Sequence, residues 1–559
     1  MKKIVNNISL VAGAAGLLLL GSCSKKIDEA FANPNALVKQ PIETLLPGVI
    51  ASMATQYSAN GTGYGPQNDG QYIGRYIQNW ATNTSLNQYD RMGDNFVNNS
   101  DVLGAVWAMH YYGMGQNVSR IIQWGTEEKK WDYVGVAQAI RAWGFLQVTD
   151  LHAEAVILRE AFRPDLLVFK YDPQEDVYEE IKRLCSAALE NLSKTGDGVS
   201  QANLDKGDHF MNGGDVNKWK KFVYGVLAQT YHRITNKSIY QPDSVIYYCD
   251  LAMQTNADNT SLKWSNAGGV GTYNYWSPFR GNVGTLRQTR FIADLMRGVN
   301  AQFPTGAVDP RAPYIIRENP NGTYRGIIPV KGGGNVTAIQ TLLLGDSSHN
   351  FWGGLFQSTA APSSDATSRY VFTNAPIWPI ISASEIQFMK SEALFRKGDK
   401  PGALAAYING INLNFDQLIS DYQTNVPAPL RITPASRAAF MANPLNVPSA
   451  GNLTLSHIMM QKYISLYAWG FMETWVDMRR YHYTDLDPIT GNQVYREFAP
   501  PNTTSTTNIN DLYPSNNGKL IYRLRPRYNS EYLYNIDELN RVGAFAGDYI
   551  TKEHYFSKP

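Results

Sequence analysis

The chain has 559 residues, and 43% of them are hydrophobic, which is ordinary for a globular protein with a sizeable core. Lys and Arg together number 50 against 48 Asp and Glu, so the formal net charge is only +2 and does not indicate a nucleic-acid-binding protein. Three cysteines are too few for a disulfide scaffold. Tyrosine is frequent, with 34 residues, and its apolar ring and polar hydroxyl suit half-wet surfaces that bind ligands.

The N-terminus has the three parts of a secretory signal. A start containing two lysines is followed by an apolar run over residues 8–20, and two small residues then precede Cys23. The apolar run is shorter than the roughly 20 residues that a membrane-spanning helix needs. The pattern predicts a lipoprotein signal peptide over residues 1–22 and a lipid anchor on Cys23. The alternative is an ordinary signal peptide that a cysteine follows by chance.

Helical periodicity dominates the rest of the chain. One apolar stripe follows a start near Asp176, another follows a capping residue at Asp215, and a long helix is expected from about Ser456 to Met478. Near residue 398 a helix is expected to end at Gly398, and Asp399 then caps the next helix. Paired helices joined by short turns predict a mostly α fold with little β structure, built on a tetratricopeptide-like helical repeat scaffold.

Three long polar segments interrupt the helices, at residues 56–100, 257–375 and 484–520. They are rich in Gly, Asn, Ser, Thr and Pro, but they also contain aromatic residues, which argues against disorder. We therefore expect long, irregular but ordered loop excursions that form the working surface. The two remaining cysteines, Cys185 and Cys249, lie on apolar helix faces, which favours buried free thiols over a bridge.

The sequence offers few candidates for catalysis or metal binding. Glu473 and Asp477 are four residues apart and share a helix face, as acid–base carboxylates can, but nearby arginines are expected to neutralise them. The eight histidines show no zinc-binding spacing, and Asp485 and Asp487 match a calcium loop only in part. We predict no catalytic residues, no metal site and no cofactor.

Several short motifs are spread in order across most of the chain. They are Asn33-Pro34-Asn35, Arg141-Ala142, Thr149-Asp150-Leu151, Tyr171-Asp172-Pro173, Gly214-Asp215, Glu385, Gly398-Asp399, Glu473 to Arg480, and Arg523 to Arg527. In this order and spacing they resemble the SusD/RagB-like nutrient-binding outer-membrane lipoproteins of Bacteroidetes. The His152 that follows Asp150-Leu151 departs from the glycine that is frequent there in the family.

The resemblance implies a single SusD-like helical domain over residues 23–559. It implies a non-enzymatic protein, anchored in the outer membrane and facing the cell exterior, that binds oligosaccharides or peptides. It also implies a partner, a SusC-like TonB-dependent transporter that imports the captured nutrient.

The aromatic and polar residues of the loops are the candidates for ligand binding. Sugar rings pack their apolar faces on aromatic side chains, while their hydroxyls need amide or guanidinium partners. We expect Trp80 to be the central contact, supported by other members of the same loops. The predicted ligand-binding residues are Trp80, Arg75, Asn79, Tyr89, Tyr72, Trp276, Tyr275 and Trp352.

Two other classes of protein stay open on the sequence alone. A lipoprotein glycosidase or peptidase would also be exported and rich in aromatic residues, although no nucleophile or acid–base constellation is evident. A helical scaffold that binds only proteins is the third possibility. The sequence does not identify the ligand.

Overall fold

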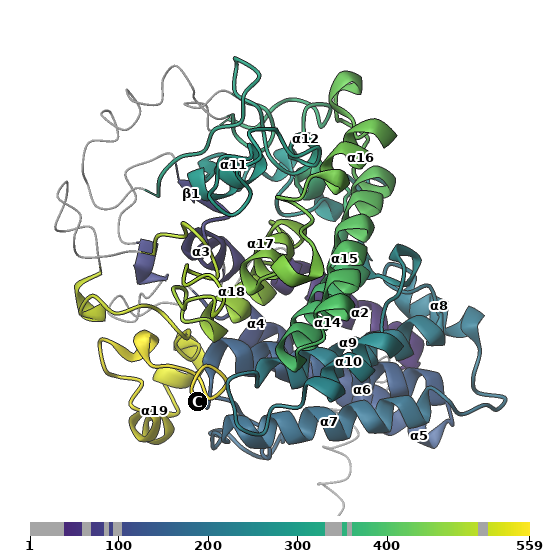
Figure 1. Ribbon diagram of the computed structural model, residues 1–559. Coiled ribbons are helices and arrows are strands. Elements are labelled where there is room, and N and C mark those ends of the chain that lie inside the picture. The colour runs from purple at the N-terminus through teal and green to yellow at the C-terminus, as the bar shows by residue number, and fades with distance from the viewer. Residues whose placement is uncertain are drawn as a thin grey trace, which may run out of the picture.

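The computed structural model shows a mostly helical protein, with helices packed against one another and irregular segments between them (Figure 1). This confirms the predicted mostly α fold. The structure describes residues 39–58, 69–82, 89–92, 103–329, 349–354, 360–500 and 513–559. The signal peptide, Cys23 and parts of the three predicted loop segments therefore lie outside the described residues.

The helices are distributed along the whole described chain. Helices α6 and α7, α9 and α10, and α14 and α15 pack as neighbouring pairs, which is the arrangement of a helical repeat scaffold. The helices are α2 (Leu46–Ser52), α3 (Asp69–Tyr76), α4 (Ala105–Ala108), α5 (Gly115–Glu127), α6 (Trp131–His152), α7 (Gln174–Asn191), α8 (Gln201–Asp208), α9 (Val216–Arg233), α10 (Pro242–Leu251), α11 (Arg290–Met296), α12 (Ala312–Ile315), α14 (Ala383–Lys397), α15 (Lys400–Asp421), α16 (Pro434–Ala442), α17 (Leu455–Ser465), α18 (Phe471–Arg480) and α19 (Ile536–Val542).

The turn between α14 and α15 follows the predicted chemistry. Gly398 has a φ of 91°, a left-handed conformation that glycine adopts without strain, and it ends α14. The side chain of Asp399 accepts a hydrogen bond from the backbone N–H of Gly402 at 2.9 Å and caps α15. Fully buried Ala393 and Ala403 lie on either side of this turn, where their small side chains allow the helices to approach closely.

The prediction of one long helix from Ser456 to Met478 is wrong. The structure divides it into α17 and α18, separated by five residues that include Ala468, whose φ is 69°. The apolar stripe continues on both sides of the break, so its periodicity does not reveal it. The break lets Tyr467 donate a hydrogen bond from its hydroxyl to the carbonyl of Asn79, at 3.0 Å.

Strands are few and short among the described residues. One antiparallel pair joins β1 (Trp80–Thr82) to β3 (Leu286–Gln288), with Trp80 opposite Gln288. The other pair joins β2 (Thr260–Lys263) to β4 (Ile377–Ile381). Each sheet connects segments far apart in the sequence. The first joins two of the predicted loop segments to each other, and the second joins a predicted loop segment to the strand that precedes α14.

One large cluster of buried apolar side chains extends through the described chain, from Ile42 to Ile550. Such a cluster suits a single domain, although the domain boundaries stay a prediction. Cys185 and Cys249 are both buried and free, as expected, and burial raises the pKa of each thiol well above its usual range. Among the described residues, no helix combines the length and the apolar character needed to cross a membrane.

Candidate functional site

Trp80, the residue expected to be the central ligand contact, lies in the core. Its side chain is completely buried, and its indole N–H donates to the carbonyl of Gln71 at 2.9 Å. The ring of Trp276 lies 4.8 Å away between centroids. Strand β1 therefore places the Trp80 ring beneath the surface, and its role as a ligand contact stays a prediction.

Trp276 and Trp352 are also completely buried, and the indole N–H of Trp352 donates to the carbonyl of Trp276 at 2.8 Å. The structure brings the segments around Trp80, Trp276 and Trp352 together in the core, with the rings of Trp80 and Trp276 tilted by 50° to each other. Tyr275, beside this cluster, is half-buried. Whether any of these residues contacts a ligand stays a prediction.

The polar members of the predicted site lie on α3 or shortly after it. The guanidinium of Arg75 lies 4.0 Å from the ring centre of Tyr72, and burial lowers the pKa of Arg75. Tyr72 itself is half-buried. Asn79 is fully buried, and neither polar atom of its amide has a hydrogen-bond partner among the described residues. An unpaired buried amide is costly, so this position suits a water or a polar ligand group.

Tyr89, another predicted ligand residue, lines a surface cavity of about 530 Å³ that we call the Gln78 cavity. Gln78 adopts a φ of 62°, and its amide donates to the carbonyl of Ala499 at 2.6 Å, so it joins two walls that are distant in sequence. The cavity is lined by Gln78, Tyr89, Arg290, Phe291, Asp294, Arg297, Val299, Asn300, Ile328, Pro329, Glu497, Ala499 and Pro500.

Charged and amide groups from two parts of the chain converge in the Gln78 cavity. On α11, Asp294 pairs with Arg290 at 3.1 Å and with Arg297 at 3.0 Å. From the opposite side, Glu497 accepts a hydrogen bond from the backbone N–H of Ala301 at 3.0 Å. The Nε of Arg297 is buried and has no partner among the described residues, so a donor is available to a ligand oxygen.

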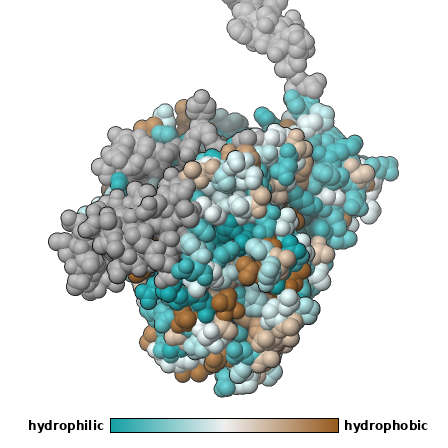
Figure 2. All heavy atoms as spheres, turned by 90° about the horizontal axis from the view of Figure 1, so that it is seen from above, coloured by the Kyte–Doolittle hydropathy of each residue, from teal (hydrophilic) through white to brown (hydrophobic). Residues whose placement is uncertain are grey.

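The face on the side of α11, α12 and α16, near which this cavity lies, is mostly hydrophilic or neutral where described residues form it, with separate apolar patches (Figure 2). A cavity lined by both apolar and polar side chains can accept hydroxyl-rich ligands whose carbon faces need some apolar contact. Of the residues that line this cavity, Tyr89 is predicted from the sequence but Arg290, Asp294 and Arg297 are not, although their spacing is helical. No local signal connects Glu497 to them.

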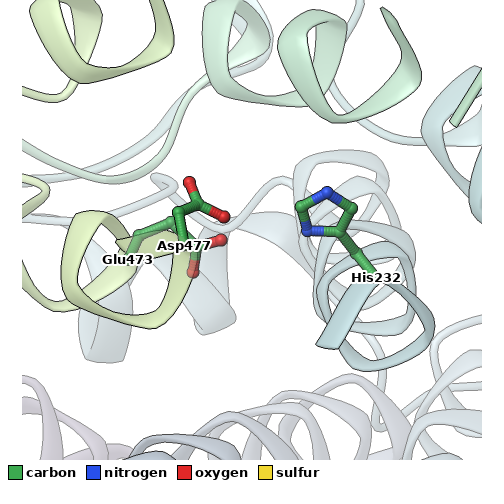
Figure 3. A group of neighbouring side chains, drawn as sticks. All are labelled: His232, Glu473 and Asp477. Atoms are coloured by element: carbon green, nitrogen blue, oxygen red, sulfur yellow. The ribbon is translucent and has the colours of Figure 1, made fainter. Parts of the chain in front are cut away.

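The carboxylates considered for catalysis form a different cluster. Glu473 and Asp477 project from the same helix, α18, and His232 faces them from α9 (Figure 3). Their ligand atoms lie within 4.8 Å of one another, as a metal site would require, and all three residues are buried.

The carboxylates of Glu473 and Asp477 already form ion pairs with basic side chains. The ammonium of Lys462 lies 2.8 Å from Asp477, while Arg480 reaches Asp477 at 2.7 Å. Burial by itself raises the pKa of Glu473, but Arg233 and Lys462 outweigh it and lower that pKa. Burial, reinforced by repulsion from Arg480, lowers the pKa of His232 to about 4, so the imidazole is neutral at pH 7. A metal ion would have to displace Lys462 from these carboxylates. A carboxylate that is ionised and paired with two cations is also a poor general acid. We therefore interpret this cluster as an internal ion-pair network.

The two carboxylates that partly match a calcium loop, Asp485 and Asp487, have partners within the protein. One oxygen of Asp487 accepts the backbone N–H of Ile489 at 2.9 Å, and the other accepts that of Ser456 at 3.0 Å. Asp485 pairs with His482 at 2.7 Å. Asp487 thereby holds its own turn against the start of α17.

Comparisons with known proteins agree with the geometry of the scaffold. The SusD-like family, described as starch-binding and associating with the outer membrane, matches residues 34–501. A SusD/RagB family protein from Bacteroides thetaiotaomicron is 19% identical, with 93% of this chain and 99% of that chain covered at a TM-score of 0.60. No curated protein matches this chain.

Two further solved structures share the fold. A SusD homologue from Bacteroides fragilis is 17% identical, with 92% of this chain and 100% of that chain covered at a TM-score of 0.65. A chitin-binding SusD homologue from Flavobacterium johnsoniae is 18% identical, with 92% and 98% covered at a TM-score of 0.60. At these identities the likeness concerns the fold.

Proposed function

This chain belongs to the SusD-like family of starch-binding proteins that associate with the outer membrane, and from that premise we propose that it is a surface lipoprotein that captures oligosaccharides for import. The observation that carries the proposal is the family match over residues 34–501. The chitin-binding homologue with the same fold supports a carbohydrate ligand over a peptide. Delivery of the captured ligand to a TonB-dependent transporter completes the proposed role.

We place the ligand site at the Gln78 cavity. The cavity volume of about 530 Å³ lies within the roughly 300–1,000 Å³ of small-molecule sites. The unpartnered Nε of Arg297 and the exposed guanidinium of Arg290 supply donors for sugar hydroxyls.

The test uses soluble protein lacking residues 1–23, first screened against glycans and peptides. Arg297→Ala should weaken binding of the glycan found by about tenfold or more, because a hydrogen bond to a charged group contributes roughly 1.5–3 kcal/mol. Arg183→Ala is a matched control, because Arg183 forms a similar i,i+3 pair with Glu180 on α7. Equal affinities of the two variants would place the site elsewhere.

The lipid anchor at Cys23 is the second part of the proposal. Two or more acyl chains give a stable anchor, since each buried methylene contributes about 0.8 kcal/mol. Cys23→Ala should abolish incorporation of labelled fatty acid and release the protein from the outer-membrane fraction. Normal labelling of that variant would refute lipidation at this residue.

The partnership with a transporter is tested by purification. A tagged full-length protein, extracted in mild detergent from its native host, should bring a TonB-dependent barrel with it. A lasting complex needs a large contact, on the order of 2,000 Å² or more. Recovery of the lipoprotein alone from cells that express both proteins would count against the complex.

Two alternative functions have distinct signatures. A glycosidase or peptidase would release product from the same glycan and peptide panel, which a binding protein leaves intact. The paired carboxylates of α18 give no support to such activity, since Lys462 and Arg480 neutralise Asp477. A scaffold that binds only proteins would bind no soluble oligosaccharide.

A further inference from the structure

A second cavity, of about 510 Å³, lies apart from the Gln78 cavity and shares no lining residue with it. Three segments distant in sequence build it, from residues 107–116, 157–169 and 527–535. Its C-terminal wall leads directly into α19, at the lower left of Figure 1, whereas α11 beside the Gln78 cavity lies in the upper part of that view. We call it the Tyr112 cavity.

One wall of the Tyr112 cavity is Phe162, which is held in an unusual backbone conformation. Its φ is 64°, in the left-handed region that bulky side chains rarely adopt. The ring lies so close to Gly115 that a Cβ there would come within 2.2 Å of it, and the guanidinium of Arg141 lies 4.5 Å from its centre. Such strained positions persist where the surroundings fix them, and they are concentrated at ligand sites.

Two exposed tyrosines from opposite ends of the chain flank the cavity. Tyr112 is 57% exposed and Tyr534 is 66% exposed. The guanidinium of Arg527 lies 5.3 Å from the ring centre of Tyr112 and helps to fix its position. Paired aromatic rings at the edges of a cavity offer apolar faces to a ligand while their hydroxyls stay in water.

A polar group on the inner wall lacks a partner. Trp107 is fully buried and lines the cavity, and its indole N–H has no acceptor among the described residues. By contrast, the hydroxyl of the neighbouring Tyr111 donates to the carbonyl of Ile157 at 3.0 Å and accepts its N–H at 2.9 Å. A buried donor left unpaired is costly, so the Trp107 N–H suits a ligand oxygen.

Several charges around the cavity are already matched. Arg163 pairs with Asp165, and Glu531 accepts from the hydroxyl of Tyr171 and from the amide of Asn535. Burial also raises the pKa of Glu531, which favours its neutral form. The lining therefore combines aromatic rings, exposed aliphatic side chains such as Leu167 and Val168, amides and buried donors that include the unpaired Trp107 N–H, with no accumulation of one sign of charge.

We propose that the Tyr112 cavity is a second oligosaccharide-binding site, in which neutral sugar rings lie between Tyr112 and Tyr534 and accept a hydrogen bond from Trp107. The choice of ligand class rests on the proposed function. The cavity volume is in the range of small-molecule sites and admits a short glycan segment. Two sites on different sides of the molecule would bind one polysaccharide at two points and slow its dissociation.

The experiment is calorimetric titration of soluble protein lacking residues 1–23 with neutral malto-, chito-, cello- and xylo-hexaose. Wild-type protein should show two classes of site for at least one of these probes. The double variant Tyr112→Ala/Tyr534→Ala should weaken one class by at least about tenfold, since central aromatic anchors contribute strongly to binding. Tyr247→Ala, which removes a tyrosine of α10 that is 59% exposed, should leave both classes unchanged.

Further variants separate the two sites and the two proposals. Arg297→Ala should weaken only the other class, and Trp107→Phe, which keeps an aromatic ring but removes the N–H, should weaken the Tyr112 class. If Arg297→Ala alone has an effect, the second site is refuted and the proposed function stands. If no probe binds the wild type, both proposals fall. Binding of an apolar peptide that requires Tyr112 and Tyr534, without glycan binding there, would also refute the ligand class.

Discussion

His110 is buried among aromatic rings, and neither ring nitrogen has a hydrogen-bond partner among the described residues. The rings of Phe145 and Tyr111 lie 4.4 and 4.8 Å from it between centroids. Burial, with a smaller effect from nearby Arg141, lowers the pKa of His110 from 6.5 to about 3. The imidazole is therefore kept neutral in a site that cannot stabilise its charge.

This shift predicts a pH dependence of stability. Because the folded pKa is below the unfolded pKa, the unfolded chain binds a proton first as the pH falls below about 6.5. The stability present above pH 6.5 is then lost progressively towards pH 3. His110→Leu should make the fall in the free energy of unfolding between pH 6 and 4 shallower, by up to about 1.4 kcal/mol per pH unit. Denaturant titrations at several pH values measure the free energy of unfolding. The same pH dependence in wild type and His110→Leu would contradict the prediction. His209→Leu, at an exposed histidine, is the control.

Trp80 gives a second prediction at the residue scale. Because its ring is completely buried, Trp80→Ala should destabilise the protein by about 3–5 kcal/mol, through lost apolar contact and the cavity left behind. Phe279→Ala, in the same aromatic loops but 42% exposed, should cost much less. Thermal melting compares the two. A Trp80→Ala variant that melts like wild type but loses glycan affinity would instead establish Trp80 as a ligand contact.

At the scale of elements, the sequence predicts a helix end correctly where residues within a single turn determine it. Gly398 and Asp399 end one helix and cap the next as predicted, because the left-handed glycine and the capping carboxylate act within a few residues. The break between α17 and α18 could not be predicted from the sequence. Contacts such as Tyr467 with Asn79, almost 400 residues away in sequence, accompany that break, and no local pattern encodes them.

The candidate site shows the same limit. Aromatic and polar composition pointed to the segment that contains Gln78 and Tyr89, and both line the cavity. Two other lining residues, Arg297 and Glu497, come from the turn that ends α11 and from a distant loop, which only the tertiary fold brings together. The burial of Trp80 also depends on its pairing with β3, which lies some 200 residues later in the chain.

The close packing of α14 against α15 predicts a specific sensitivity. Ala393 is fully buried beside the turn, and the hydroxyl of Ser391 donates to the carbonyl of Ala403 at 2.7 Å across it. Ala393→Leu should therefore overpack the pair and cost about 1–3 kcal/mol. Ala405→Leu, on the exposed face of α15, is the control and should change stability little. Glycan affinity of the folded Ala393→Leu protein should stay near wild type, and a large affinity loss at normal stability would place the ligand site on the repeats.

At the scale of the whole molecule, a buried ion-pair network joins five helices. Arg233 on α9 contacts Asp150 on α6 at 3.0 Å, and it also contacts Glu473 on α18 at 2.8 Å. Arg480 on α18 contacts Glu392 on α14 at 2.9 Å. These residues lie between positions 150 and 480, so the network fixes how distant repeats are placed relative to one another.

Lys462 on α17 is a cation shared by two carboxylates of this network. It lies 2.8 Å from Asp477 and 3.4 Å from Glu473, and it is almost completely buried. Its positive charge also acts on Glu385, whose pKa is raised by burial and by repulsion from Glu473. Without Lys462, three buried carboxyl groups would have fewer cations to balance them.

Lys462→Met should therefore destabilise the protein by about 3–5 kcal/mol, because breaking a buried pair leaves an uncompensated charge. Lys390→Met removes a more exposed pair with Asp250 on the surface and should cost no more than about 1 kcal/mol. The double variant Lys462→Met/Asp477→Asn should recover part of the loss, since it removes a carboxylate together with the cation. Denaturant unfolding measures all three variants. If the double variant is no more stable than Lys462→Met alone, the loss comes from packing around Lys462 and the network does not balance charge as described.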